Sequence, residues 1–142
     1  MAVEKYYTQV HIGGAMKKIE QFSDLTGETL KSVKGEAGDD EIIFELEDGR
    51  KFRLYHERDC CESVYVESVI GNLSDLVGTP LLMADEVCGA ELDDREGKLN
   101  ECDESYTWTF YKLATVKGYV DIRFYGTSNG YYSESVSFVK AY

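Results

Sequence analysis

The chain of 142 residues carries 27 acidic and 15 basic side chains, for a formal net charge of −12, and its length predicts one domain, residues 1–142. The negative charge argues against nucleic-acid or anionic-membrane partners, since both require a positive field. No apolar run approaches the ~20 residues that cross a bilayer, so we expect no membrane association.

Apolar residues alternate over short segments that glycine turns separate, which predicts a chain built mainly from β-strands. In chain order, the expected strands cover residues 6–12, 29–34, 41–47, 50–55, 64–70, 81–87, 105–115, 119–125 and 131–139. We expect short helical turns near residues 21–25 and 73–77, the second capped by Asn72 or Ser74. Residues 91–104 have no apolar period and predict a charged, mobile loop.

The dipeptide Asp48-Gly49 marks the clearest hairpin, because such a pair favours a tight turn between two strands. The alternation places Phe52 and Leu54 on the inward face of the second arm. His56 continues that inward phase. We therefore expect its ring to sit at the edge of the core, bonded to a backbone carbonyl or to Glu62, and this structural role competes with a functional one.

Many strands, hairpin turns and hardly any helix together indicate a mainly β fold, described more fully as β-rich α+β. We expect an antiparallel meander that forms a sandwich or a partly closed barrel, with one or two short helices.

The stretch 55–62 concentrates reactive side chains, among them His56, Asp59, Cys60 and Cys61. These include zinc-ligand types, but zinc sites normally use separated ligand pairs, and a nucleophilic cysteine beside His56 needs a third orienting group. Adjacent cysteines on an extended chain point to opposite faces, which predicts one buried and one partly exposed thiol. We expect no metal, no cofactor and reduced thiols.

The common nucleotide-hydrolysing, dehydrogenase, acyl-transfer and zinc-protease motifs are missing from the sequence, so we expect a binding protein rather than an enzyme. Arginines suit phosphates, aromatic rings suit stacking, and short polar groups suit ribose or base edges. The ligand-binding candidates are Arg53, Tyr55, His56, Arg58, Asp59, Glu62, Trp108, Arg123, Tyr125, Asn129 and Tyr131. Tyrosine and serine on an outer strand face also raise strand propensity and solubility, which is the competing interpretation.

Two blocks carry a resemblance: residues 55–86, beginning YHERDCCESV, and residues 103–138, which contain SYTWTFYKLAT. They cover about half of the chain and resemble a small family of phage and prophage proteins of unknown function. The resemblance implies a phage accessory protein in the host bacterial cytoplasm, and it brings no assigned active site.

The chain also resembles, by analogy of type, phage proteins that sequester nucleotide immune signals such as cyclic ADP-ribose isomers or histidine-ADP-ribose. The expected function is therefore to bind such a small nucleotide-derived ligand and counter bacterial defence. The alternative is an acidic inhibitor or DNA mimic that binds a host protein through residues 36–47 and 91–104. Unpaired strand edges further predict a two-fold homodimer, with aromatic side chains near residues 105–111 or 125–132 approaching the partner.

Overall fold

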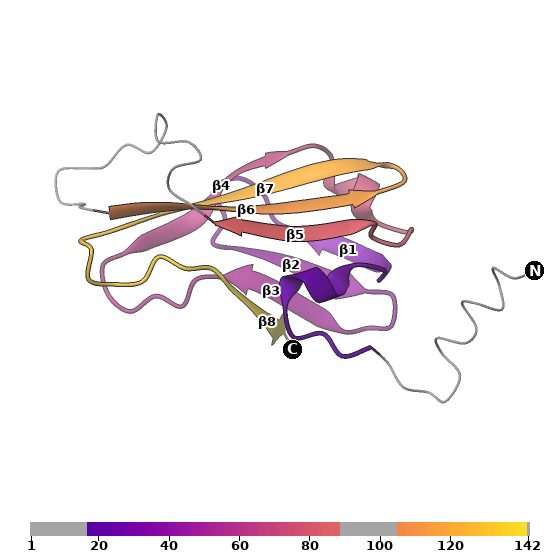
Figure 1. Ribbon diagram of the computed structural model, residues 1–142, viewed down its shortest axis with the longest axis horizontal. Coiled ribbons are helices and arrows are strands. Elements are labelled where there is room, and N and C mark those ends of the chain that lie inside the picture. The colour runs from indigo at the N-terminus through magenta and orange to yellow at the C-terminus, as the bar shows by residue number, and fades with distance from the viewer. Residues whose placement is uncertain (1–16, 89–104, 142) are drawn as a thin grey trace, which may run out of the picture.

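The computed structural model describes residues 17–88 and 105–141, and its eight strands form two four-stranded antiparallel sheets (Figure 1). The first sheet has the order β1-β2-β3-β8, with bounds Leu30–Lys34, Glu41–Leu46, Lys51–Tyr55 and Ser137–Ala141. The second has the order β4-β7-β6-β5, with bounds Ser63–Ile70, Gly118–Ser128, Ser105–Thr115 and Met83–Cys88. The architecture is sandwich-like without a closed barrel, which confirms the mainly β prediction. The predicted strand 6–12 and loop 91–104 lie outside the described residues.

The core lies between the two sheets, where the predicted alternation places the apolar side chains. Ile42 pairs with Leu54 across the β2–β3 ladder, and Phe44 pairs with Phe52; all four are buried. The 3₁₀ helix η1 (Phe22–Leu25) adds Phe22, whose ring lies 4.8 Å from the Tyr111 ring in an edge-to-face contact. These contacts confirm the inward face predicted for the second hairpin arm, and the first arm packs against it in the same way.

The second 3₁₀ helix, η2, covers Leu73–Leu76, and Asn72 caps it by accepting the Ser74 N–H at 3.0 Å, as one of the two predicted caps. Both helices have four residues, and in the described ranges no helix is long and apolar enough to cross a membrane.

Two predicted strands are wrong in position. β8 begins at Ser137 rather than at residue 131, because the side chains of Ser128, Asn129 and Ser133 accept the backbone N–H groups of residues 130, 131 and 135. Such local bonds replace the ladder that a strand needs. The predicted buried strand 81–87 is an edge strand from Met83, in which Ala84 alone is fully buried.

Three connections meet at one end of the sandwich, on the left in Figure 1: residues 35–40 between β1 and β2, 56–62 between β3 and β4, and 129–136 between β7 and β8. The last two cross from one sheet to the other. The first is tied to β4, since Val66 N–H donates to the Asp39 carbonyl at 2.9 Å.

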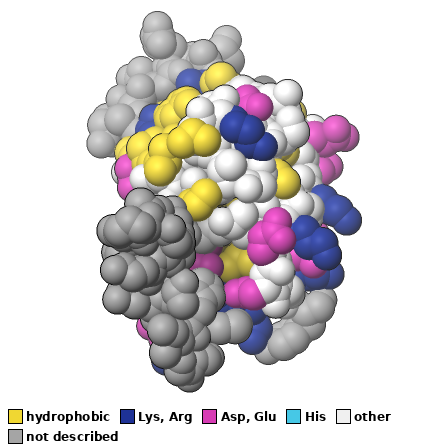
Figure 2. Space-filling model, turned by 90° about the vertical axis from the view of Figure 1, so that its right-hand side faces the viewer, with side chains coloured by type: hydrophobic (Ala, Val, Ile, Leu, Met, Phe, Trp, Pro, Cys, Tyr) yellow, Lys and Arg dark blue, Asp and Glu magenta, His cyan; other side chains and the backbone are white. Residues whose placement is uncertain are grey.

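The opposite end, which contains the β6–β7 hairpin, is different in character. Hydrophobic side chains gather over part of it (Figure 2), and Val116 in the hairpin is 75% exposed. The polar candidate residues of the stretch 55–62 therefore lie at the end away from this apolar surface.

Leu54 provides a test of the packing, because its side chain is fully buried between the sheets. We expect Leu54→Ala to lower the free energy of unfolding by about 2–5 kcal/mol through lost burial and a residual cavity. Val116→Ala is the exposed control, with an expected change within about 0.5 kcal/mol. Denaturant unfolding would measure both, and equal effects of the two substitutions would contradict the assigned core.

Candidate functional site: a groove at the crossover end

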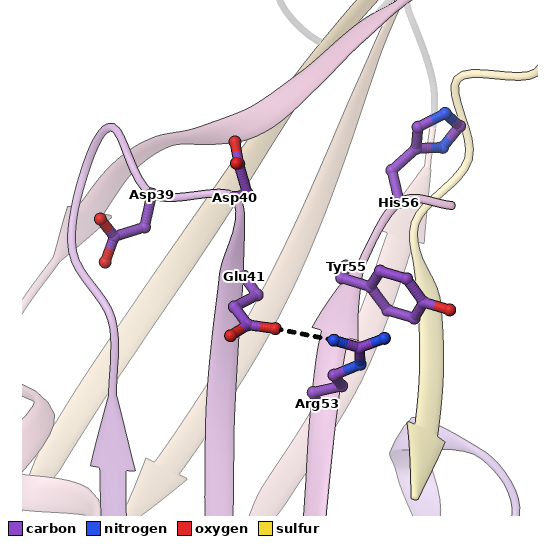
Figure 3. Close-up of a pocket in the computed structure, with 6 residues that line it drawn as sticks. All are labelled: Asp39, Asp40, Glu41, Arg53, Tyr55 and His56. Carbon is purple, nitrogen blue, oxygen red and sulfur yellow. Dashed lines mark hydrogen bonds and ion pairs between the residues drawn. The ribbon is translucent and has the colours of Figure 1, made fainter. Parts of the chain in front are cut away.

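Two adjoining depressions form an open groove where the three connections meet. The larger, of about 480 Å³, is lined by Asp39, Asp40, Glu41, Arg53, Tyr55 and His56 (Figure 3). The smaller, of about 160 Å³, is lined by Asp40, His56, Arg58, Glu62, Ser63 and Val64. They share Asp40 and His56, so the groove runs from the outer face of the first sheet around its end.

The Glu62 carboxylate organises the crossover 56–62 from within. Its side chain is buried although it is ionisable, and the residue is 1% exposed. Its Oε2 accepts the Asp59 N–H at 2.7 Å and lies 2.6 Å from His56 Nε2, while its Oε1 accepts the Cys60 N–H at 3.0 Å. The Asp59 N–H foremost, followed by His56, lowers the pKa of Glu62 to about 2.

His56 lies between two hydrogen-bond acceptors. Its Nδ1 is 2.7 Å from the carbonyl oxygen of Ser135, and its Nε2 faces the ionised Glu62. Each ring nitrogen therefore faces an oxygen atom that can only accept a hydrogen bond. Its side chain is 6% exposed. The predicted inward orientation is confirmed, and both predicted partners are present at once.

Through Ser135, His56 joins the two sheet-to-sheet crossovers to each other. In Figure 3 its ring turns toward the segment that leads into β8. Both ring nitrogens of His56 and both carboxylate oxygens of Glu62 are occupied by protein contacts. Their arrangement therefore shapes the groove wall rather than leaving a free acid or base.

Arg53 and Tyr55 form the floor of the larger depression. The Arg53 guanidinium lies over the Tyr55 ring, 3.7 Å from its centroid, and its Nη1 donates to Glu41 Oε1 at 3.1 Å (Figure 3). The Tyr55 hydroxyl donates to Glu57 Oε1 at 2.7 Å. The Arg53 side chain remains 36% exposed, so this fixed, planar cation presents its other face to the solvent.

Arg58 and Asp40 face the groove with unused polar groups. Arg58 is anchored through Nε, which donates to the Cys60 carbonyl at 3.2 Å. Within residues 17–88 and 105–141, no carboxylate lies within ion-pair distance of its guanidinium, and no hydrogen bond joins the Asp40 carboxylate to another group. Asp39 differs, because it points away and accepts the Glu36 N–H at 3.0 Å.

The cysteine predictions need correction. Cys60 and Cys61 are joined by a disulfide, rather than reduced, and both are exposed, rather than one buried. The prediction assumed an extended chain, but the crossover bends here, so the two adjacent side chains can meet. Across the described part of the chain, no group of three His, Cys, Asp or Glu side chains is arranged to hold a metal ion.

The second crossover, 129–136, has its own buried carboxylate. Glu134 accepts the Thr107 hydroxyl at 2.7 Å and the Ser128 hydroxyl at 2.5 Å. Its Cβ approaches Gly126 so closely that a Cβ on Gly126 would lie 3.0 Å away, which explains the glycine there. Asn129 bonds the Tyr131 N–H, and Tyr131 is 83% exposed; neither lines the groove.

The other three candidates lie elsewhere. Trp108, Arg123 and Tyr125 are on the outer face of the second sheet, where the Trp108 and Tyr125 rings are 4.7 Å apart and Arg123 lies over Phe110 at 5.2 Å. Trp108 is 1% exposed and its indole N–H has no hydrogen-bond partner. The predicted set of eleven therefore divides: five residues line the groove, Asp59 belongs to the adjoining turn, and five do not take part.

Sequence reasoning missed five groove-lining residues, Asp39, Asp40, Glu41, Ser63 and Val64. The first two follow Gly38 at a turn, and that signal could have indicated exposed carboxylates at a strand start. The Ser135 carbonyl, which binds His56, carries no side-chain signal at all.

The depressed pKa of Glu62 generates a prediction for Glu62→Gln. The pKa of Glu62 is lowered from 4.5 to about 2 in the folded protein. The carboxylate therefore stabilises the fold at pH values above 4.5, and this contribution is lost as the pH falls toward 2. We expect the variant to melt below the wild type at neutral pH and the gap to close between pH 5 and pH 2. Thermal unfolding across this range measures the difference in melting temperature between the two proteins. A difference independent of pH would contradict the lowered pKa of Glu62.

A comparison with protein families matches residues 16–138 to DUF7448, a domain of unknown function. No curated protein and no solved structure matches the chain. The match spans most of the sequence and includes every residue of the groove. The chain therefore belongs to the DUF7448 family of uncharacterised domains.

Proposed function

We propose that this protein is a phage-type accessory protein that binds and sequesters a small nucleotide-derived immune signal in the bacterial cytoplasm, without converting it. One observation carries the binding proposal: the groove combines a stacked, partly exposed guanidinium with a second guanidinium and a carboxylate that have no ion-pair partner in the part of the chain that the structure describes. These are the groups that a ribose, a base and a phosphate require.

Each part of such a ligand has a counterpart. Arg58 provides unused N–H donors for a phosphate from the smaller depression. The exposed face of the Arg53 guanidinium, supported by Tyr55, provides a planar surface for a base. Asp40, which lines both depressions, provides an acceptor for ribose hydroxyls.

Sequestration without turnover is supported by the state of His56 and Glu62. A general base needs a free lone pair, and a general acid needs a proton that it can release toward the substrate. Both nitrogens of His56 face protein acceptors, and both oxygens of Glu62 accept protein N–H groups. The two most plausible acid–base groups of the groove are thus occupied by structural bonds.

The acidic-inhibitor alternative receives less support from the outer face of the first sheet. Glu41 is paired with Arg53, and Glu45 lies 3.9 Å from Lys31 and accepts the Ser32 hydroxyl. These pairs divide the face into local dipoles rather than a uniform negative field. Its other proposed segment, residues 91–104, lies outside the described residues.

Calorimetric titration with ADP-ribose derivatives and cyclic dinucleotides tests the proposed binding. We expect one ligand class to bind, and Arg58→Gln to weaken it about tenfold to a hundredfold, as the loss of a charged hydrogen bond implies. Lys51→Gln, an exposed change on the same strand as Arg53, is the matched control and should bind normally.

Chromatography of the titrated sample completes this test, because a sequestered ligand is recovered intact after hours. Flat titrations across the whole panel would refute the binding proposal, and a converted ligand would refute sequestration.

The homodimer remains a prediction. Of the aromatic residues expected to approach the partner, fewer are exposed and available for the contact. Trp108 and Tyr125 are buried within one chain, whereas Tyr131 is exposed beside the groove end. We expect light scattering to give twice the chain mass of 16.1 kDa at micromolar concentrations. The substitution Tyr131→Ser should lower the measured mass toward that of one chain. A wild-type mass of one chain would refute the dimer.

A further inference from the structure

The crossover 56–62 contains a covalent bond for which the proposed binding function has no use: the disulfide between the neighbouring residues Cys60 and Cys61. Both residues are exposed, so a thiol reagent in solution can reach the sulfur atoms. The bond closes a small ring that includes the peptide group between the two cysteines. Rotation of that peptide group is restricted as long as the ring is closed.

The carbonyl oxygen of this same peptide group anchors Arg58. It accepts the Arg58 Nε–H at 3.2 Å, and within residues 17–88 and 105–141 this is the hydrogen bond that holds the guanidinium at the smaller depression. The preceding N–H, that of Cys60, donates to the buried Glu62. The ring therefore connects the solvent-exposed sulfur atoms directly to a cation of the groove.

We propose that Cys60–Cys61 is a redox site that controls the position of Arg58 in the groove. A dithiol is the reductant: one of its thiolates attacks a cysteine sulfur, the other cysteine leaves as a thiolate, and the second thiol resolves the mixed disulfide. Two electrons and two protons pass to the protein, giving two cysteine thiols and the oxidised dithiol. The open ring lets the Cys60–Cys61 peptide rotate, and Arg58 loses its anchor.

Glu62 confines the change to this part of the turn. Its bonds to the Asp59 N–H and to His56 involve groups outside the ring, so they persist when the ring opens. Reduction therefore moves Arg58 while the two crossovers stay joined. The effect on ligand affinity is the only step that rests on the proposed function.

The first test counts thiols in the Cys88→Ser/Cys102→Ser variant, which keeps only Cys60 and Cys61. We expect no thiol to react with a chromogenic disulfide reagent in denaturant, and two to react after dithiothreitol treatment. Two reactive thiols before any reductant, in protein purified under air, would overturn the proposal.

The second test follows Arg58 itself by nuclear magnetic resonance of arginine Nε–Hε groups, assigned by loss of the signal in Arg58→Lys. We expect the Arg58 resonance to shift on reduction, and Cys60→Ser and Cys61→Ser to give the shifted position with or without dithiothreitol. Arg50, whose Nε donates to Asp48 in a different turn, is the internal control and should not move. An Arg58 resonance that is unchanged on reduction would overturn the proposal.

The third test measures the affinity for ADP-ribose in both redox states, with an expected loss of about threefold to tenfold on reduction. Equal affinity in both states would overturn control of the groove. If ADP-ribose binds in neither state, the ligand proposal fails, and the thiol count and the Arg58 resonance still decide the redox site.

Discussion

The hydrogen bonds to the buried Glu62 carboxylate are the interaction on which the crossover end depends. A chain that passes from one sheet to the other leaves the ladder, so its backbone N–H groups need new acceptors. Glu62 accepts two of them and contacts His56 Nε2, and these contacts compensate for the burial of its charge. Without the carboxylate, two N–H groups and one ring nitrogen of the buried His56 would lack partners, and the His56 contact with Ser135 would lose its support.

The strands were predictable because their signals are local. Period-two alternation and a turn dipeptide determine which side chains of β2 and β3 face inward, and the buried Ile42, Phe44, Phe52 and Leu54 agree with it. The start of β8 was not predictable, because the preceding residues 131–136 have strand-like composition. The outcome there depended on whether serine and asparagine side chains would take the backbone N–H groups, and spacing cannot show that.

The site was predictable where its members are neighbours in sequence. His56, Arg58 and Glu62 lie within seven residues, so a single turn brings them together. The error concerned candidate residues that lie on different sheets. Arg53 and Arg123 both face outward, but a sandwich has two outer faces, and the sheet order places these arginines on opposite ones. An outward phase therefore places a side chain on one of two outer faces and does not say which other side chains share that face.

Charge also constrains what the groove can hold. The chain carries a net charge of −12, and the free Asp40 carboxylate lines both depressions. A polyanion would meet repulsion from the whole molecule and from this residue, and Arg58 is the one guanidinium of the groove without a neighbouring carboxylate in the described ranges. A site can select its ligand by repelling other molecules as well as by contacting the correct one. The groove therefore favours a ligand with few phosphates, whose hydroxyl or amino groups can face Asp40 while a single anionic group reaches Arg58.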